Sequence, residues 1–308
     1  MDIKRTAIVT DTNSGITPEE GRRDGIFVLP MPFVVNGKEY LDCVNLSHRE
    51  FYSFLEQGAD VTTSQPAAGD VISLWNEIFD GGYEEIVHIP MSSGLSGAYS
   101  SAALFSSDFD GKVQVVNNQR ISVTQRQSVY DALYLASNGH SAAEIKDILE
   151  ASKYDSSIYI MVDTLEYLKK GGRVTPAGAA LAKILNLKPI LTIQGEKLDA
   201  YSKCRGLKQA KSIMLKAMIN DINTRFGGYD PEAPGVFLEV AHTENEENAL
   251  MFADEIREVF PGSNVQVAPL PLSISCHIGP GSLAIACSKA VKDGQPCIPE
   301  REVICETA

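Results

Sequence analysis

The sequence predicts an α/β protein built from two domains. Three observations carry this prediction: the chain has 308 residues, which exceeds one typical domain, strand-like apolar runs alternate with helix-like segments, and several strands end in loops rich in serine, threonine and glycine. Alternation of this kind is typical of a mainly parallel sheet with helices on both faces. Sheets of that type bind ligands at the carboxyl ends of their strands, so the loops become candidate site segments.

Composition narrows the classes of partner. Hydrophobic residues make up 44% of the chain and charged residues 22%, which is ordinary for a globular protein. The formal net charge of −13 argues against nucleic acid and against an anionic membrane surface. We expect a cytoplasmic protein without stable membrane insertion, because no apolar run could span a bilayer and residues 1–10 lack a signal-peptide pattern. The six cysteines show no metal-binding spacing, so we expect reduced thiols, no metal and no cofactor.

The alternating pattern defines an N-terminal α/β domain over residues 1–154. Ser47 with Glu50 and Ser141 with Glu144 have the spacing of capping boxes, which open helices. The run at 26–35 contains two prolines, so we expect a strand followed by an edge excursion. The expected strands are 6–9, 26–35, 86–89 and 112–116, and the expected helices begin near Pro18, Ser47, Ala67, Ala98, Ser122 and Ser141.

A second α/β domain is expected over residues 155–291, followed by a polar tail at 292–308. The segment around 276–281 is interpreted as extended. The expected strands are 157–162, 189–193, 198–201, 236–240, 265–268 and 282–286, and the expected helices are 176–185, 206–226, 243–259 and a short one from Thr164.

Two hydroxyl-rich loops point to an anion site. Ser92-Ser93-Gly94-Leu95-Ser96-Gly97 lies between a strand and a helix, and Thr62-Thr63-Ser64-Gln65-Pro66 precedes another helix. The first N–H groups of a helix have no internal partner and its dipole favours negative charge, so a phosphate or a carboxylate would suit such loops. Ordinary turn and capping roles would explain either loop alone. Arg173, beside a glycine pair, would supply local positive charge in this acidic chain.

A serine hydrolase is the alternative. Gly94-Leu95-Ser96-Gly97-Ala98 is close to a nucleophile elbow, and Ser96, Asp163 and His277 stand in the chain order of that triad. The last glycine of the elbow is alanine here, and no oxyanion motif precedes it. A sugar or phosphate binder is a third class, which would need polar residues where the chain has Leu181, Ile184 and Leu185.

The motifs together resemble one family, the DegV family of bacterial fatty-acid-binding proteins. The resemblance runs from Ile8 to about Ala286, whereas the segment 117–120 departs from the usual pattern and the tail after Lys289 is longer. The matching motifs are Thr63-Ser64-Gln65-Pro66, Ser92-Ser93-Gly94-Leu95-Ser96-Gly97, Asp163-Thr164-Leu165-Glu166-Tyr167-Leu168, Gly171-Gly172-Arg173, Lys188-Pro189-Ile190-Leu191 and His277-Ile278-Gly279-Pro280-Gly281.

The resemblance implies a long-chain fatty acid, such as palmitate, stearate or oleate, in an apolar tunnel at the domain junction. It places the carboxylate on Thr63 and Ser96, supported by His277. It implies a lipid-binding protein without catalytic residues of its own, which presents the carboxylate to an ATP-dependent fatty acid kinase for phosphorylation to an acyl phosphate. Supporting or partner-facing roles are implied for Arg173, Arg205, Ser64, Ser93 and Gly94.

Overall fold

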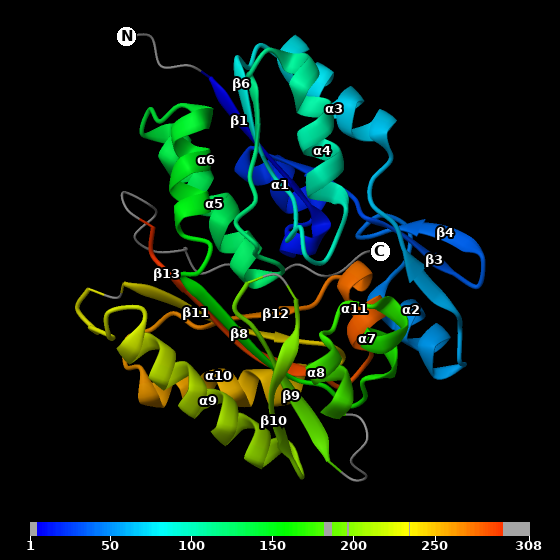
Figure 1. Ribbon diagram of the computed structural model, residues 1–308, viewed down its shortest axis with the longest axis vertical. Helices are drawn as coiled ribbons and strands as arrows, with labels where there is room; N and C mark the ends of the chain where they lie inside the picture. Colours follow the sequence, from blue (N-terminus) through cyan, green and yellow to red (C-terminus); the bar gives the residue numbers. More distant parts are fainter. Residues whose placement is uncertain (1–4, 182–186, 196, 234, 292–308) are drawn as a thin grey trace.

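The computed structural model describes residues 5–181, 187–195, 197–233 and 235–291 (Figure 1). The predicted polar tail at 292–308 and the end of the predicted helix 176–185 lie outside these residues. Two large sheets and one small sheet organise the described chain. Among the described residues, no helix has both the length and the apolar composition needed to cross a membrane.

The first large sheet is parallel throughout and has helices on both faces, which confirms the predicted fold class. Alternate residues of its strands enter two cores: Ile8 packs toward α5 and α6, whereas Ala7 and Val9 pack with Trp75 of α3. In strand order the sheet is β2 (Ile26–Leu29), β1 (Thr6–Asp11), β6 (Glu85–Ile89) and β7 (Val113–Val115), and its helices are α3 (Ala68–Asp80), α4 (Ala98–Ser106), α5 (Val123–Ser137) and α6 (Ala142–Ala151).

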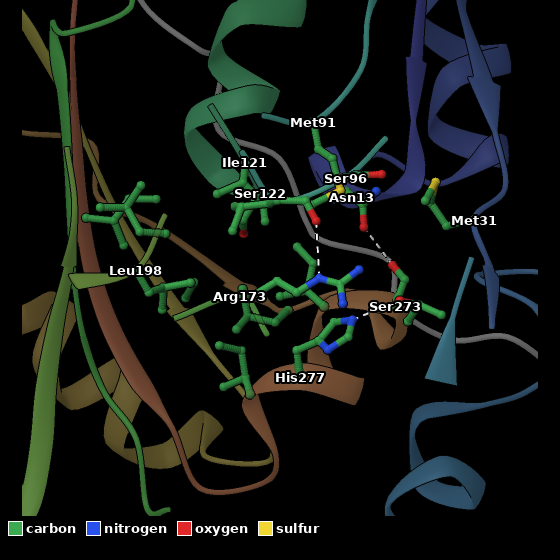
Figure 2. Close-up of a pocket in the computed structure, with 18 of the residues that line it drawn as sticks. Asn13, Met31, Met91, Ser96, Ile121, Ser122, Arg173, Leu198, Ser273 and His277 are labelled. Carbon is green, nitrogen blue, oxygen red and sulfur yellow. Dashed lines mark hydrogen bonds between the residues drawn. The ribbon is translucent and has the colours of Figure 1, made fainter. Parts of the chain in front are cut away.

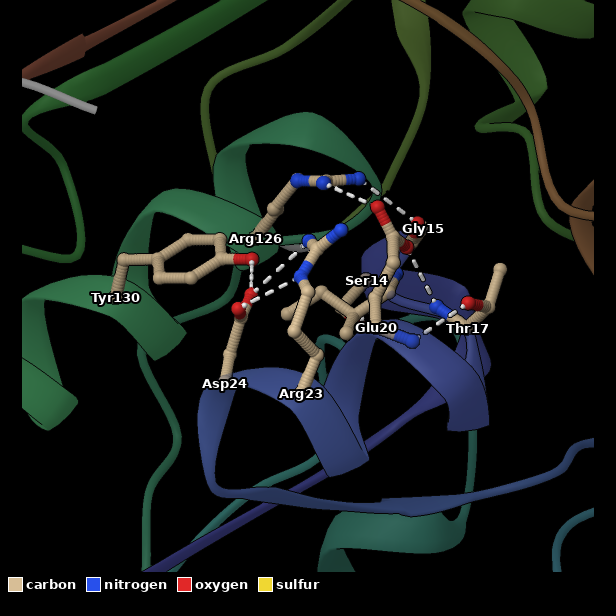
Figure 3. Close-up of polar contacts among 9 residues, drawn as sticks. Ser14, Gly15, Thr17, Glu20, Arg23, Asp24, Arg126 and Tyr130 are labelled. Carbon is tan, nitrogen blue, oxygen red and sulfur yellow. Dashed lines mark hydrogen bonds and ion pairs between the residues drawn. The ribbon is translucent and has the colours of Figure 1, made fainter. Parts of the chain in front are cut away.

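A buried ion pair joins the first turns of the chain to α5. β1 runs into the short helix η1 (Thr12–Ser14) and then α1 (Pro18–Asp24). Arg126 of α5 pairs with Glu20 at 2.9 Å and donates to the carbonyl oxygen of Gly15, also at 2.9 Å (Figure 3). The η1 turn is thereby anchored to the helix that follows it by more than a hundred residues.

The predicted strand 26–35 divides between two sheets. After Leu29 the chain passes Pro30, which cannot donate a ladder hydrogen bond, and continues as a strand of a separate antiparallel sheet. Thr63 ends a strand of this small sheet and not of the parallel sheet, but its loop still lies beside the Ser96 loop, since Gln65 donates to the Ser101 hydroxyl at 2.8 Å. The sheet has the order β4 (Lys38–Leu41), β3 (Pro32–Val35), β5 (Val61–Thr63), and α2 (His48–Glu56) packs on it.

The second large sheet has six strands and is antiparallel except between β11 and β12. The helices α9 (Leu207–Thr224) and α10 (Glu246–Val259) cover one of its faces. In order the strands are β10 (Asp199–Cys204), β9 (Lys188–Ile193), β8 (Ser156–Met161), β13 (Leu283–Lys289), β11 (Val236–His242) and β12 (Gln266–Pro269).

The other face of this sheet is turned toward the first sheet and α5 (Figure 1). Three short helices surround it: α7 (Glu166–Gly171), α8 (Pro176–Ala180) and α11 (Leu272–Ile278). In the chain, all strands of the parallel sheet precede the six strands of the second sheet. The predicted boundary between two domains at residue 154 stays a prediction.

Residues 272–278 form a helix, although the sequence pattern was interpreted as extended around His277. The buried carboxylate of Asp42 explains the difference, because it accepts hydrogen bonds from the N–H groups of Leu272 at 3.2 Å and Ser273 at 3.3 Å. These are the first turn's donors, which have no partner within a helix. A cap that lies about 230 positions away in the chain leaves no local signal.

Replacing Arg126 with methionine should lower the free energy of unfolding by about 3 kcal/mol, because Glu20 would remain buried without its partner. Arg23→Met is the matched control: Arg23 is 47% exposed, so its pairing with Asp24 should contribute less than about 1 kcal/mol. Urea unfolding followed by circular dichroism measures both. Equal losses for the two variants would contradict this account.

Candidate functional site

A cavity of about 280 Å³ lies between the second sheet's open face and the loops of the first half of the chain. Alternation along the strands explains its depth. Ile285 and Cys287 of β13 pack toward α9 and α10, whereas Ala284 and Ala286 face the cavity with Ala241 of β11. Small side chains on central strands leave space there. The remaining apolar lining consists of Met31, Met91, Leu95, Ile121, Val123, Ile158, Ile160, Leu168, Ile193, Leu198, Leu270, Ile274 and Ile278.

Four of the predicted site residues line the polar part of this cavity. Thr63, Ser96, Arg173 and His277 come from four separate segments and meet there. Figure 2 shows the last three of them. The Thr63 hydroxyl lies 2.8 Å from Nε2 of His277. The Nε–H group of Arg173 donates to the carbonyl oxygen of Leu95 at 3.2 Å, and its Nη1 donates to the carbonyl oxygen of Gly171.

The glycines of two motifs make room for these side chains. A Cβ atom on Gly171 would lie 2.2 Å from Nδ1 of His277, so no larger residue fits beside the imidazole. A Cβ atom on Gly97 would similarly lie 2.6 Å from the side-chain oxygen of Gln65. Gly171 thus leaves room for the histidine, which is more than a hundred residues away in the chain.

The Ser96 loop presents a hydroxyl group to the cavity, and most of its backbone N–H groups are already used. The N–H groups of Leu95 and Ser96 donate to the carbonyl oxygen of Ser92, and that of Gly94 donates to the Ser92 hydroxyl. The Ser96 hydroxyl accepts from the N–H of Ala98 at 3.2 Å. Its own O–H can therefore be donated to a ligand. The donor that this loop offers is thus a side-chain hydroxyl, whereas the sequence pattern pointed to the backbone N–H groups of a helix N-terminus.

His277 is a neutral group in this setting. Burial, and to a smaller extent the positive charge of Arg173, lowers the pKa of its imidazole to about 4. At neutral pH one ring nitrogen carries a proton and the other does not. With the proton on Nε2, the ring donates to the Thr63 oxygen and leaves the Thr63 proton for a ligand.

The other predicted residues are placed differently. Ser64 is exposed and lines the cavity, whereas Ser93 and Gly94 are half-buried and are not part of the lining. Arg205 is exposed on the connection between β10 and α9 and is not part of the lining. Their supporting or partner-facing roles stay predictions.

Of the three residues of the hydrolase alternative, Ser96 and His277 line the cavity and Asp163 does not. Asp163 is exposed and pairs with Lys188 at 2.6 Å, while Nε2 of His277 contacts Thr63. Among the hydrogen bonds of the described residues, none joins Ser96, Asp163 and His277 to one another.

Several polar lining residues had no assigned role in the sequence analysis, among them Asn13 and Ser273. Asn13 of η1 and Ser273 of α11 are both buried, and the Ser273 hydroxyl donates to Oδ1 of Asn13 at 2.8 Å (Figure 2). The polar loop after the first strand was a visible signal for Asn13. Ser273 had none, because its segment was not recognised as a helix.

We expect the His277 imidazole to titrate near pH 4 and to remain neutral at pH 6. Its folded-state pKa lies below the ordinary 6.5, so its contribution to stability should be present above pH 6.5 and be lost as the pH falls toward 4. NMR titration of the histidine ring protons, with His277→Gln for assignment, measures this. A midpoint above pH 6 would contradict the burial argument.

The chain was compared with protein families, curated proteins and solved structures. A family model described as an uncharacterised protein of the DegV family matches residues 5–290. The DegV domain-containing protein SA1258 of Staphylococcus aureus strain N315 is 28% identical over 286 residues, which are 92% of this chain and 98% of that protein.

Two solved structures have the same fold over nearly their full length. The DegV family protein from Thermus thermophilus, described by its fatty acid binding, is 28% identical with a TM-score of 0.84, over 92% of this chain and 99% of that one. DegV from Bacillus subtilis, described as a fatty acid binding protein, is 28% identical with a TM-score of 0.81, over 93% and 99%. With the family model matching 286 consecutive positions, the chain belongs to the DegV family.

Proposed function

We propose that this protein binds one long-chain fatty acid, with the tail in the apolar cavity and the carboxylate at Thr63, Ser96 and His277. The observation that carries the proposal is a largely apolar cavity with hydroxyl, imidazole and guanidinium groups gathered on one side. Figure 2 shows Leu198 on the side of the cavity opposite Asn13 and Ser273. The fatty acid binding attributed to the relatives from T. thermophilus and B. subtilis supports the same ligand class.

The tail supplies affinity and the head group supplies orientation. Burying one methylene contributes about 0.8 kcal/mol, so about 14 buried methylenes would contribute ~11 kcal/mol before ordering costs. A buried carboxylate without donors would cost several kcal/mol, whereas each hydrogen bond to a charged group contributes about 1.5 to 3 kcal/mol. Thr63 and Ser96 can provide such bonds. The acid therefore binds in one direction.

Presentation to a kinase is the finer part of the proposal. Ser64, Gln65 and Gly97 are exposed and also line the cavity, so the head group would lie near the protein surface. The Nε and Nη1 donors of Arg173 are engaged by the carbonyl oxygens of Leu95 and Gly171. A carboxylate held mainly by neutral hydroxyl groups stays a better nucleophile than one clamped by arginine, which suits transfer of a phosphoryl group from ATP on a separate kinase. The protein itself acts as a carrier.

Denaturing mass spectrometry of the purified protein should detect co-extracted C14 to C18 fatty acids. The double variant Thr63→Val, Ser96→Ala should retain at least tenfold less lipid, because both hydroxyl donors are lost. Thr62→Val, Ser100→Ala is the matched control, since both of its positions are exposed neighbours of the site residues. No lipid in the wild type, with no uptake on addition, would refute the proposed function, and full retention in the double variant would refute the head-group assignment.

Replacing Ala286 with phenylalanine should abolish fatty-acid uptake and leave the fold intact, because the ring would occupy the space of the tail. Ala151→Phe, at an exposed position of α6, should bind lipid normally. Thermal unfolding of the delipidated proteins tests the fold, and binding of tritiated palmitate tests the site. Normal palmitate binding by a folded Ala286→Phe variant would mean that the tail lies elsewhere.

A further inference from the structure

Ser122 is the N-cap residue of α5, but its hydroxyl group does not cap the helix. A serine at this position normally accepts a hydrogen bond from a backbone N–H of the first turn. Here the residue is 6% exposed and lines the cavity (Figure 2). Among the hydrogen bonds of the described residues, those of Ser122 involve its backbone alone. The cavity wall thus contains a buried hydroxyl group that the described chain does not use.

The backbone holds Ser122 in a conformation that favours glycine. Its φ is 55° and its ψ is −135°, and a residue with a side chain is strained there. The N–H of Ser122 donates to the carbonyl oxygen of Asn13 at 2.9 Å, and its carbonyl oxygen accepts from the N–H of Arg126, also at 2.9 Å. These two bonds maintain the strained turn. A glycine would relieve the strain, so a side chain at this position calls for an explanation.

Ser122 lies near the head-group end of the cavity. The N–H of Ser92 donates to the carbonyl oxygen of Arg120 at 2.8 Å, and the carbonyl oxygen of Ser92 accepts from the N–H of Ser96 at 3.2 Å. The segment that leads into Ser122 is therefore bonded directly to the loop that carries Ser96. Figure 2 shows Ser122 between Ser96 and Leu198. A fatty acid whose carboxylate is held at Ser96 would pass Ser122 with its first carbons.

We propose that the Ser122 hydroxyl binds a hydroxyl group close to the ligand's carboxylate, so that the preferred ligand is a 2- or 3-hydroxy fatty acid. This inference rests on the proposed function. An unsubstituted chain would cover the Ser122 hydroxyl and leave it without water, which disfavours binding. A hydroxyl group both donates and accepts, so one on the ligand can satisfy the serine. Sites built around such a bond discriminate against analogues that lack the group, because a buried polar group is then left unpaired.

Competition against tritiated palmitate on delipidated protein measures the affinities for palmitate, 2-hydroxypalmitate, 3-hydroxypalmitate and 16-hydroxypalmitate. The wild type should bind the 2- or the 3-hydroxy acid about fivefold or more tighter than palmitate. It should bind 16-hydroxypalmitate more weakly than palmitate, because the terminal hydroxyl would be buried among apolar side chains. Ser122→Ala should bind palmitate about threefold or more tighter than the wild type and lose the preference. Ser137→Ala, at an exposed position of the same helix, should leave all four affinities unchanged.

Each possible failure has a separate meaning. A wild type that binds none of the four acids would overturn the proposed function, whereas one that binds palmitate as tightly as the 2- and 3-hydroxy acids would overturn this inference alone. A preference that persists in Ser122→Ala would also overturn it, and so would weaker palmitate binding by that variant, which would make the hydroxyl a head-group contact. If Ser122→Ala does not fold, Ser122→Gly decides the question, because glycine adopts a φ of 55° without strain. Retention of the preference by Ser122→Gly would overturn the inference.

Discussion

The second sheet has one face that α9 and α10 do not cover, and much of the site follows from this constraint. An apolar sheet face must be buried, and here loops and helix ends from the first half of the chain cover it. Ala241, Ala284 and Ala286 on the central strands keep the two halves from filling the space between them. The cavity is thus a consequence of small residues at alternate positions of β11 and β13.

The polar side of the cavity shows how an acidic protein can prepare a place for an anion. With a net charge of −13, the chain as a whole repels negative charge. The site compensates locally with donors: hydroxyl groups, a histidine that burial keeps neutral, and an arginine whose guanidinium is tied to backbone oxygens. Since these side chains come from elements far apart in the chain, any large movement between the two halves would disperse the site.

α11 connects the small sheet to this arrangement. Asp42, just after β4, caps α11 by accepting from the N–H groups of Leu272 and Ser273 and also contacts Thr12. The Tyr52 hydroxyl of α2 bonds Ser275 on the same helix. His277, one turn beyond Ser273, therefore owes its position to residues of the first fifth of the chain. The small sheet that the sequence pattern did not separate from the parallel one is the support of the helix that carries the imidazole.

The sequence by itself determined the parallel sheet with helices on both faces, the capping boxes at Ser47 and Ser141 and the family to which the chain belongs, because strand and helix periodicity, caps and short motifs are local signals. Tertiary structure alone decided that Thr63 belongs to a separate antiparallel sheet, that α11 is helical, that Gly171 makes room for His277, and that Asn13 and Ser273 line the cavity. Each of these depends on a contact between residues far apart in the chain, and no local pattern records which distant group will cap a helix or face a cavity.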